Sequence, residues 1–297
     1  MRAFLFFLVV FFGCTEATKT LPGSTGKDSE VVFVVEDNLW KNTADSLVKT
    51  VFGRPIQAIN QRESLFRIIQ VNHSEFKSIL KRHKNVIIVS EGAKKSVQKN
   101  KWAFGQLVAQ LNWQSDLQKS RKALISLRKI FVAKELESIK RSFEKTSQKN
   151  IEKRHLSNFG TEIIIPKEYQ IVRNESSFFW ANYDPKKSEE IKNIFTFSFT
   201  PKTSNLQAEV LTKTDSVFAK YFIGEKAGSY VRIEPGYPPY YFENTYRGLW
   251  KLENGFMGGP FLIKTHIGNN EIVVSVGFVF APQSRKRRYI KEFEAIL

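Results

Sequence analysis

The stretch GLWKLENGFMGGPF, residues 248–261, decides the architecture of the second half of the chain. Apolar and charged side chains alternate through TYRGLWKLE, which is the period of a β-strand with one buried face. An Asn-Gly pair (254–255) and a Gly-Gly pair (258–259) follow, and both can adopt positive φ at little cost. Pro260 cannot donate to a strand ladder and is expected to stop pairing. The stretch therefore predicts two strands joined by a wide turn.

The alternation also sorts the side chains of the first of these strands into two faces. One face carries Tyr246, Gly248, Trp250 and Leu252, and the other carries Arg247, Leu249, Lys251 and Glu253. We expect Phe256, Met257 and Phe261 to pack inward. No helix follows whose N-terminus could hold a phosphate, so the glycines are interpreted as structural. A ligand site is the alternative, because binding residues often lie on loops.

The rest of the second half has the same β-rich texture. Short apolar or alternating runs (TEIIIPKEYQIV, SFFWANY, IFTFSFT) precede a helix at residues 206–222, and further strands follow it, with GNN (268–270) as a hairpin turn. A final helix, SRKRRYIKEFEAIL, has an apolar face that can cover a sheet. Residues 161–297 are thus predicted to form an antiparallel α+β domain.

The first half alternates between strands and helices. Residues 31–35 form an apolar run typical of a strand that is buried on both faces. A strand is also expected at 102–112, a basic loop before it, and a long helical region that Ser115 caps and Gly160 ends. Two apolar stripes in that region differ in register and suggest a bend or a break. Residues 29–160 are thus predicted to form a basic α/β domain.

Taken together, these patterns predict an α+β fold. An N-terminal α/β layer carries long basic helices, and a C-terminal, mostly antiparallel sheet is covered by helices.

The N-terminus has the features of an export signal. Arg2 precedes an apolar run at residues 3–12, then Gly13 and Cys14. The run is about half the length of a membrane-spanning helix, which makes a signal peptide at 1–13 the favoured interpretation. A small residue directly before the one cysteine of the chain resembles the lipobox of bacterial lipoproteins. The resemblance implies acylation of Cys14 and, through Thr15, placement at the outer membrane, with the face undetermined.

Residues 14–28 are polar and contain Pro22, Gly23 and Gly26, which predicts a flexible, lipidated tether. Their GSTGKDS is shorter than a phosphate-binding loop, has no preceding strand, and carries Asp28 where such a loop needs Ser or Thr. We therefore expect no nucleotide site. A buried core cysteine is the alternative reading of Cys14.

The chain is strongly basic, with 46 Lys and Arg against 29 Asp and Glu. Between Lys77 and Arg154 there are 20 basic and 6 acidic residues, counted from the sequence. Solvated helix faces explain this most simply. Contact with anionic lipid headgroups, or with an envelope glycan or protein, is the functional alternative, and Lys119, Lys122, Lys129 and Lys140 are its candidate residues. Nucleic acid is not an expected partner of an exported chain.

The sequence predicts no cofactor and no metal. His155 lies on an apolar helical line and is expected to be a packed core residue. The other histidines, His73, His83 and His266, show no metal-ligand spacing.

Motifs of common enzymes are also missing, among them GxSxG and GxGxxG. Glu234, Glu243 and Glu253, on neighbouring predicted strands, could form a carboxylate pair for glycan cleavage, although a salt-linked sheet surface is favoured. The candidate binding surface comprises Arg232, Glu234, Arg247, Trp250, Glu253, Phe256 and His266. GYPPYYF (236–242) is either a proline-protected sheet edge or an aromatic platform for a sugar or peptide.

Several stretches carry a family resemblance: GLWKLENGFMGGPF, GFVFAP (277–282), the terminal EFEAIL, and the early VVEDNLW and GQLVAQ. With the lipidated N-terminus, they resemble the Bacteroidota lipoprotein family known as domain of unknown function 4837. The resemblance covers nearly all of the mature chain and implies location and architecture, but it assigns no catalytic residue. We therefore expect a non-enzymatic binding or assembly component of the envelope, with a hydrolase of glycan or peptidoglycan as the alternative.

Overall fold

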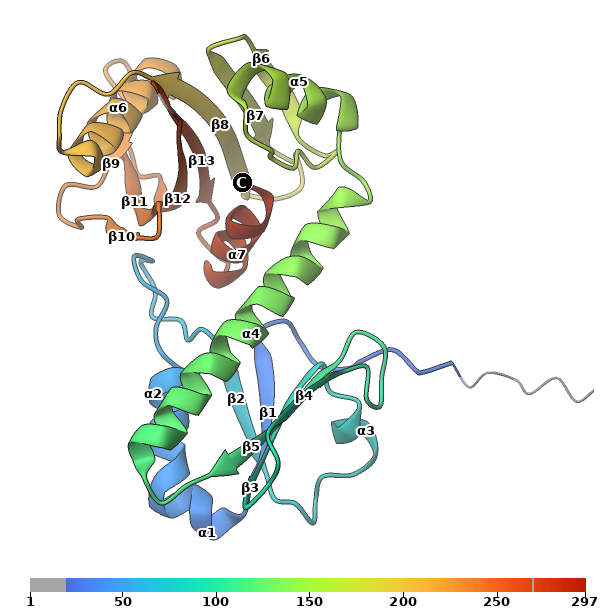
Figure 1. Cartoon of the computed structure of the whole chain (residues 1–297). Helices are drawn as coiled ribbons and strands as arrows, with labels where there is room; N and C mark the ends of the chain where they lie inside the picture. The colour runs from blue at the N-terminus through green and yellow to red at the C-terminus, as the bar shows by residue number, and fades with distance from the viewer. Residues whose placement is uncertain (1–19, 269) are drawn as a thin grey trace, which may run out of the picture.

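The computed structural model describes residues 20–268 and 270–297, so the predicted signal peptide and Cys14 lie outside the described residues. Two sheets lie at opposite ends of the molecule, and the long helix α4 (Leu117–Glu144) runs from one to the other (Figure 1). The fold is α+β, as the sequence predicts: an α/β unit precedes a larger antiparallel unit.

The first sheet has five strands in the order β2-β1-β3-β5-β4. Their bounds are β1 (Glu30–Val34), β2 (Arg67–Val71), β3 (Asn85–Glu91), β4 (Ser96–Lys99) and β5 (Leu107–Trp113). All pairs are parallel except β4–β5. Every residue of β1 is buried, and β1 lies between β2 and β3, as expected for a continuous apolar run.

The two faces of this sheet are covered unequally. On one face, α1 (Asp37–Leu39), a π-helical turn (Trp40–Ala44), α2 (Asp45–Val51) and the first half of α4 enclose a core that includes Phe33, Phe52 and Phe131. On the other face, the short helix α3 (Ser78–Lys81) and the loop at 100–106 cover a smaller core around Phe76 and Val86, against which Leu80 and Trp102 pack. The second face of the sheet is therefore covered by only a short helix and a loop, and we call it the thinly covered face.

Three local predictions in this unit were wrong. The basic loop contains an edge strand, β4, and the strand expected at 102–112 begins only at Leu107. Asn100 and Gly105 have φ of 53° and 79°, and the Trp102 N–H donates to Gln106 Oε1, so residues 100–106 form a turn instead. The α4 cap is Asp116, not Ser115, because its carboxylate accepts the N–H groups of Gln118 and Lys119.

Helix α4 also has no break, in contrast to the bend suggested by its apolar stripes. It continues for 28 residues and contains neither glycine nor proline. Its apolar face shifts because the helix passes from one core to the other: Leu124, Leu127 and Phe131 are buried in the first unit, whereas Phe143 packs against the second.

The second sheet has eight strands. Seven follow the order β10-β11-β12-β13-β8-β7-β6, β9 pairs with β11, and all pairs are antiparallel. The bounds are β6 (Gln170–Asn174), β7 (Phe178–Tyr183), β8 (Ile191–Phe199), β9 (Tyr230–Ile233), β10 (Tyr240–Phe242), β11 (Thr245–Glu253), β12 (Gly258–Ile267) and β13 (Ile272–Phe280).

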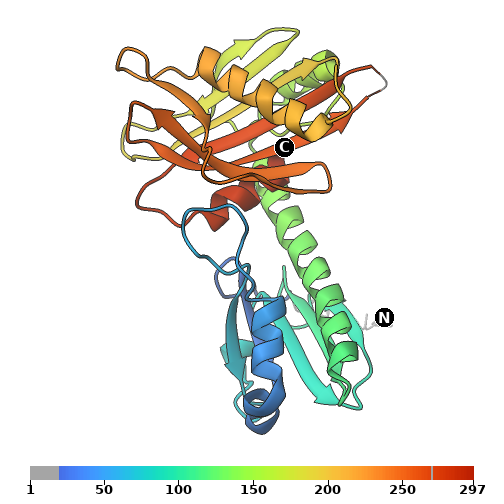
Figure 2. The same ribbon diagram turned by 90° about the vertical axis from the view of Figure 1, so that its left-hand side faces the viewer.

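Helices cover both faces of this sheet (Figure 2). On one face, α6 (Leu206–Tyr221) packs on an aromatic core that includes Phe195, Phe218 and Phe278. On the other face, α5 (Lys149–Phe159) and α7 (Arg287–Ile296) pack on a second core that includes Tyr289 and Phe293. The segment GYPPYYF supplies β10, an outer strand of the sheet, in agreement with the edge interpretation.

A buried polar cluster joins the two units. Lys291 Nζ of α7 donates to Glu135 Oε2 of α4 at 2.6 Å and to Ser29 Oγ at 2.9 Å. The Ser29 hydroxyl donates to Glu135 Oε1 at 2.7 Å. Nearby, the Glu63 carboxylate accepts the backbone N–H groups of Lys286 and Arg287 at the start of α7. The two sheets are thus held together by side chains from the approach to β1, from α4, from α7 and from the 53–66 loop.

Candidate functional site

The stretch GLWKLENGFMGGPF lies in a β-hairpin. Strand β11 pairs with β12 from Thr245↔Lys264 to Lys251↔Gly258, and residues 254–257 form the turn. The wide turn is confirmed. Pro260 does not stop pairing, however, because it pairs with Leu249 of β11 at a position that precedes the first pair between β12 and β13, Phe261↔Phe278. Proline is tolerated there because β12 has only one neighbour at that position.

The glycines of this hairpin have packing roles. A Cβ on Gly259 would lie 2.1 Å from the carbonyl oxygen of Val279, the atom that accepts a 3.2 Å hydrogen bond from Trp250 Nε1. A Cβ on Gly248 would lie 2.4 Å from the ring of Phe261. Both residues are therefore glycine because neighbouring atoms already occupy the space that a side chain would need.

The candidate binding residues do not form one surface, because β11 places them on opposite faces. Trp250 points into the α6 core and is 4% exposed, whereas Arg247 and Glu253 lie on the α7 side. Arg247 pairs with Glu294 of α7, and burial lowers its pKa. His266 is exposed on β12, and partial burial of its ring and the neighbouring Lys264 lower its pKa.

The structure brings together the charged residues at the end of β9 and β11. Glu253 lies 3.5 Å from Arg232 and 3.2 Å from Lys251, in a salt-linked cluster on the sheet surface. The Glu234 carboxylate accepts the N–H of Gly236 at 3.1 Å. Glu243 is separate, because it occupies the β10–β11 turn with φ of 45°. The three acids therefore do not converge on one point.

Part of this charged group lines a polar pocket of about 380 Å³ that we call the hairpin pocket. Glu234, Tyr237, Lys251 and Glu253 form its walls together with the backbone of the 254–259 turn, and Asn60 reaches it from the first unit. Glu253 is already paired with two cations, Arg232 and Lys251.

Phe256 was expected to pack inward, and this expectation was wrong. The side chain is 91% exposed. Asn254 has φ of 56° at the start of the turn, and Met257 packs against the core instead. The Phe256 ring lies 6.3 Å from the ring of Phe280, the last residue of β13.

Beside that ring is a second pocket, of about 200 Å³, that we call the α6 pocket. It opens between the C-terminal end of α6 and the sheet. Its apolar walls are formed by Trp180, Tyr221, Phe222, Met257, Phe278 and Phe280. Ile223, at its rim, is 70% exposed. Unlike the hairpin pocket, this one is lined mainly by aromatic and aliphatic side chains.

Two amides give the α6 pocket a polar point. Asn193 Oδ1 accepts from Trp180 Nε1 at 2.9 Å and from Asn182 Nδ2 at 3.0 Å. Within residues 20–268 and 270–297, no hydrogen bond uses Asn193 Nδ2 or Asn182 Oδ1, so one NH2 group and one carbonyl oxygen remain for a ligand. This site was not predicted from the sequence. The asparagines that interrupt two apolar strands were the available signal.

Helical position correctly predicts the environment of His155. It is fully buried, with Nδ1 3.1 Å from the Thr161 carbonyl and Nε2 2.9 Å from Thr196 Oγ1. Burial lowers its pKa to about 4. In the described part of the chain, no group of three or more His, Cys, Asp or Glu side chains could hold a metal ion.

The comparisons with known proteins agree with the division into two units. The model of "Domain of unknown function (DUF4837)" matches residues 147–297, about half of the chain. This chain belongs to the DUF4837 family. The model of "Domain of unknown function (DUF8532)" matches residues 24–144. Both pockets lie almost entirely within the DUF4837 region, whereas the basic first unit corresponds to the DUF8532 match.

No curated protein matches the chain. Among solved structures, the human StarD13 (DLC2) lipid transfer and protein localization domain is similar at 10% identity, covering 43% of this chain and 83% of that one, with a TM-score of 0.22. A similarity at this level carries no functional argument. Within residues 20–268 and 270–297, no helix has the length and apolarity that crossing a bilayer requires.

Proposed function

We propose that this protein is an exported, lipid-anchored binding or assembly component of the outer membrane or periplasm, and that it binds a second envelope protein through the α6 pocket. The observation that carries the binding role is the pocket itself. An apolar cavity with an exposed apolar rim, one unused amide nitrogen and one unused amide oxygen is suited to an apolar side chain together with its backbone amide.

The size of the pocket supports a side chain rather than a larger ligand. A volume of about 200 Å³ is below the range of about 300–1,000 Å³ that is usual for drug-sized ligands. Ile223 and Phe256, exposed to 70% and 91%, extend the apolar surface beyond the pocket, as at the centre of many protein interfaces. A hydrolase has less support, because Glu253 is paired with cations and Glu243 lies apart.

Binding of hexanamide, an apolar chain with an amide head, tests the pocket. We expect a dissociation constant of about 1 mM, because so small a ligand gains about 4 kcal/mol. Saturation-transfer NMR should detect binding to the wild type. Ile223→Trp places a large ring over the entrance without altering the core, and should weaken binding by at least about tenfold, which is about 1.4 kcal/mol.

The matched control is Val172→Trp. Val172 is 47% exposed on the edge strand β6 and does not line the pocket. Equal loss of binding in both variants, or no binding by the wild type, would contradict the proposed site. Photo-crosslinking from position 223, but not from position 172, should then identify the second protein in native membranes.

Labelling with radioactive palmitate tests the anchor. Wild-type protein should incorporate label and sediment with membranes, whereas Cys14→Ser should lose the label and be released, because acyl chains supply the firm attachment. The support for this prediction is the apolar run at 3–12 followed by Gly13 and Cys14. Label retained in Cys14→Ser would refute acylation at this residue.

A further inference from the structure

The first described residues form part of the first unit rather than a free tether. Residues 22–25 lie between the segment 79–84 and the loop at 100–106. The Ser24 N–H donates to the Phe104 carbonyl at 3.0 Å, and the Phe104 N–H donates to the Pro22 carbonyl at 2.8 Å. The Thr25 N–H donates to the Arg82 carbonyl at 2.9 Å. The chain therefore enters the fold on the thinly covered face of the first sheet.

Apolar side chains around this entry point face solvent. Phe104 is 70% exposed, Ile79 is 64% exposed and Leu21 is 44% exposed. Trp102 is half-buried between them and the core, with Lys101 Nζ 4.6 Å from the centre of its ring. An aromatic and an aliphatic side chain this exposed have no role in the described core, and an apolar group of this kind is typical of a contact surface.

The segment that supplies most of this surface is basic. Between Glu75 and Asp116 the sequence carries eight Lys and Arg and one acid, Glu91. The basic residues are Lys77, Lys81, Arg82, Lys84, Lys94, Lys95, Lys99 and Lys101. Of the nearby acids, Asp28 pairs with Lys84 and Glu30 pairs with Arg67, so neither neutralises Lys81 or Lys101. We call the group Leu21, Ile79, Lys81, Lys101, Trp102 and Phe104 the α3 surface.

We propose that the α3 surface lies against a bilayer of anionic phospholipid, with Phe104 and Ile79 in the headgroup region and Lys81 and Lys101 at lipid phosphates. Tryptophan beside lysine at an apolar surface is the combination that favours a membrane interface. Basic residues close to anionic lipid add to the binding that apolar burial provides.

The position of the chain entry supports the orientation. Thr20, the first described residue, is six positions beyond Cys14, and an extended chain of that length spans at most about 20 Å. If Cys14 is acylated, a step that rests on the proposed anchor, the α3 surface stays close to the bilayer. Among the described residues of the first unit, no other exposed apolar group is as close along the chain to the anchor.

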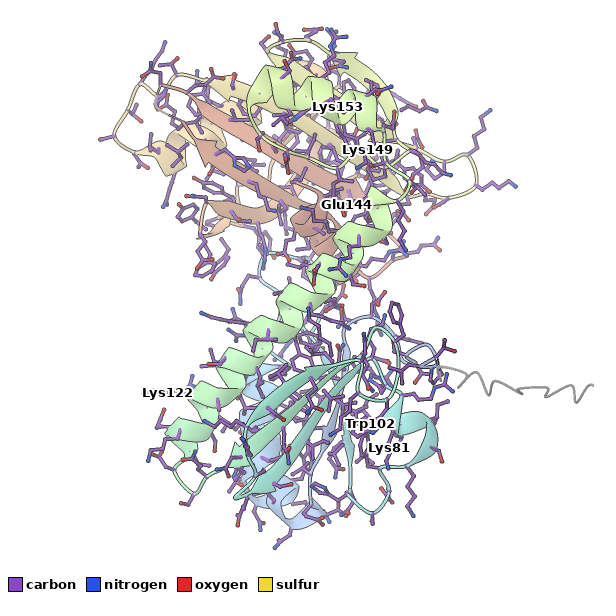
Figure 3. The ribbon with its side chains drawn as sticks, turned by 45° about the vertical axis from the view of Figure 1, so that its right-hand side comes forward. Lys81, Trp102, Lys122, Glu144, Lys149 and Lys153 are labelled. Atoms are coloured by element: carbon purple, nitrogen blue, oxygen red, sulfur yellow. The ribbon has the colours of Figure 1, made fainter. Side chains whose placement is uncertain are left out.

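Helix α4, the candidate lipid contact in the sequence analysis, is less suitable. Figure 3 shows Lys122 on α4 at one side of the first sheet, with Lys81 and Trp102 at the other. Along α4, Lys119 lies 3.9 Å from Asp116, and Lys140 lies 3.9 Å from Glu144, so each of these two lysines already has an acidic neighbour. Lys122 and Lys129 remain exposed and provide matched control positions.

Vesicle binding by the chain from residue 20 onward tests the surface without the anchor. Every described helix and strand lies in this segment, and so do all the buried cores. We expect co-sedimentation with mixed phosphatidylglycerol and phosphatidylcholine vesicles, and much less with phosphatidylcholine alone. The double variants Ile79→Ser/Phe104→Ser and Lys81→Glu/Lys101→Glu should each weaken partitioning by at least about tenfold.

The control variants change the same kinds of side chain, lysines and an exposed ring, outside the α3 surface. Lys122→Glu/Lys129→Glu changes as many charges on α4, and Phe242→Ser removes a ring that is 56% exposed on β10 of the second unit. Both variants should bind as the wild type does. Equal loss in the α4 control would refute a localised surface, and absence of wild-type binding would refute the proposal. Missing palmitate label with intact vesicle binding would refute only the anchor.

Discussion

Replacing Lys291 with methionine is expected to lower the free energy of unfolding by about 3–5 kcal/mol, because the substitution leaves a buried carboxylate without its cation. The side chains of Lys291 and Glu135 are 3% and 5% exposed, and their charged atoms are 2.6 Å apart. Burial lowers the pKa of Lys291, and the Glu135 carboxylate opposes that shift. Urea denaturation followed by circular dichroism measures the loss.

The cost arises from the uncompensated charge and not from the pair as such. Lys291→Met combined with Glu135→Leu should therefore recover a large part of the stability, since replacing both members of a buried pair is often nearly neutral. The surface control is Arg141→Met, which removes the partner of Glu137 on the exposed side of α4 and should cost less than about 1 kcal/mol. A similar cost for Lys291→Met and Arg141→Met would contradict this account.

The location of the cluster adds a second expectation for the same variant. Ser29 precedes β1, Glu135 lies in α4 and Lys291 lies in α7, so the cluster connects the first sheet to a helix of the second unit. Its loss should make the two units unfold less cooperatively. Probes in the separate units, such as Trp113 and Trp250, should then report different midpoints.

Acidification from about pH 6.5 to about pH 4 is expected to remove about 3 kcal/mol of stability through His155. Its folded pKa is about 4 against an ordinary value of 6.5, because the neutral ring is buried. Above the pKa of His155 in the unfolded chain, neither state binds a proton and the full contribution of His155 to stability is present. As the pH falls below the unfolded pKa, the unfolded chain binds a proton that the folded chain does not bind, so the free energy of unfolding declines.

The hydrogen bonds of the ring define its neutral form. Nδ1–H donates to the Thr161 carbonyl, and Nε2 accepts the Thr196 hydroxyl, whose oxygen is 3.2 Å from Ser275 Oγ. A proton on Nε2 would remove the acceptor of the Thr196 hydroxyl hydrogen bond. His83, also buried and with a lowered pKa, adds in the same direction.

His155→Gln separates this contribution from the general effect of acid. The variant should be less stable than the wild type at neutral pH, and the difference should shrink as the pH approaches 4, since the variant has no ring to protonate. Denaturation curves at several pH values measure the difference. A constant difference between pH 7 and pH 4 would show that His155 does not titrate as the buried geometry requires.

The sequence is sufficient to predict elements whose pattern is local. The continuous apolar run of β1, the alternation in TYRGLWKLE and the helical position of His155 each predict burial correctly, because burial follows from strand or helix period. The α+β class followed from the same patterns.

Features that depend on distant partners were not predictable. The Lys291–Glu135 pair joins residues 156 positions apart, and the α6 pocket combines strand residues with the end of α6. Phe256 was misplaced because turn geometry, not hydrophobicity, decides its direction. The candidate surface residues were divided because neighbours along β11 face opposite ways.

The unbroken helix α4 also fixes the distance between the two units. A helix of 28 residues is about 42 Å long and cannot shorten without losing its hydrogen bonds. The α3 surface belongs to the unit at one end of this helix and the α6 pocket to the unit at the other (Figure 1). If the first touches lipid, the second is presented tens of ångströms into the aqueous space. A protein that reaches this pocket therefore need not approach the bilayer, and its attachment point lies at a fixed height above it.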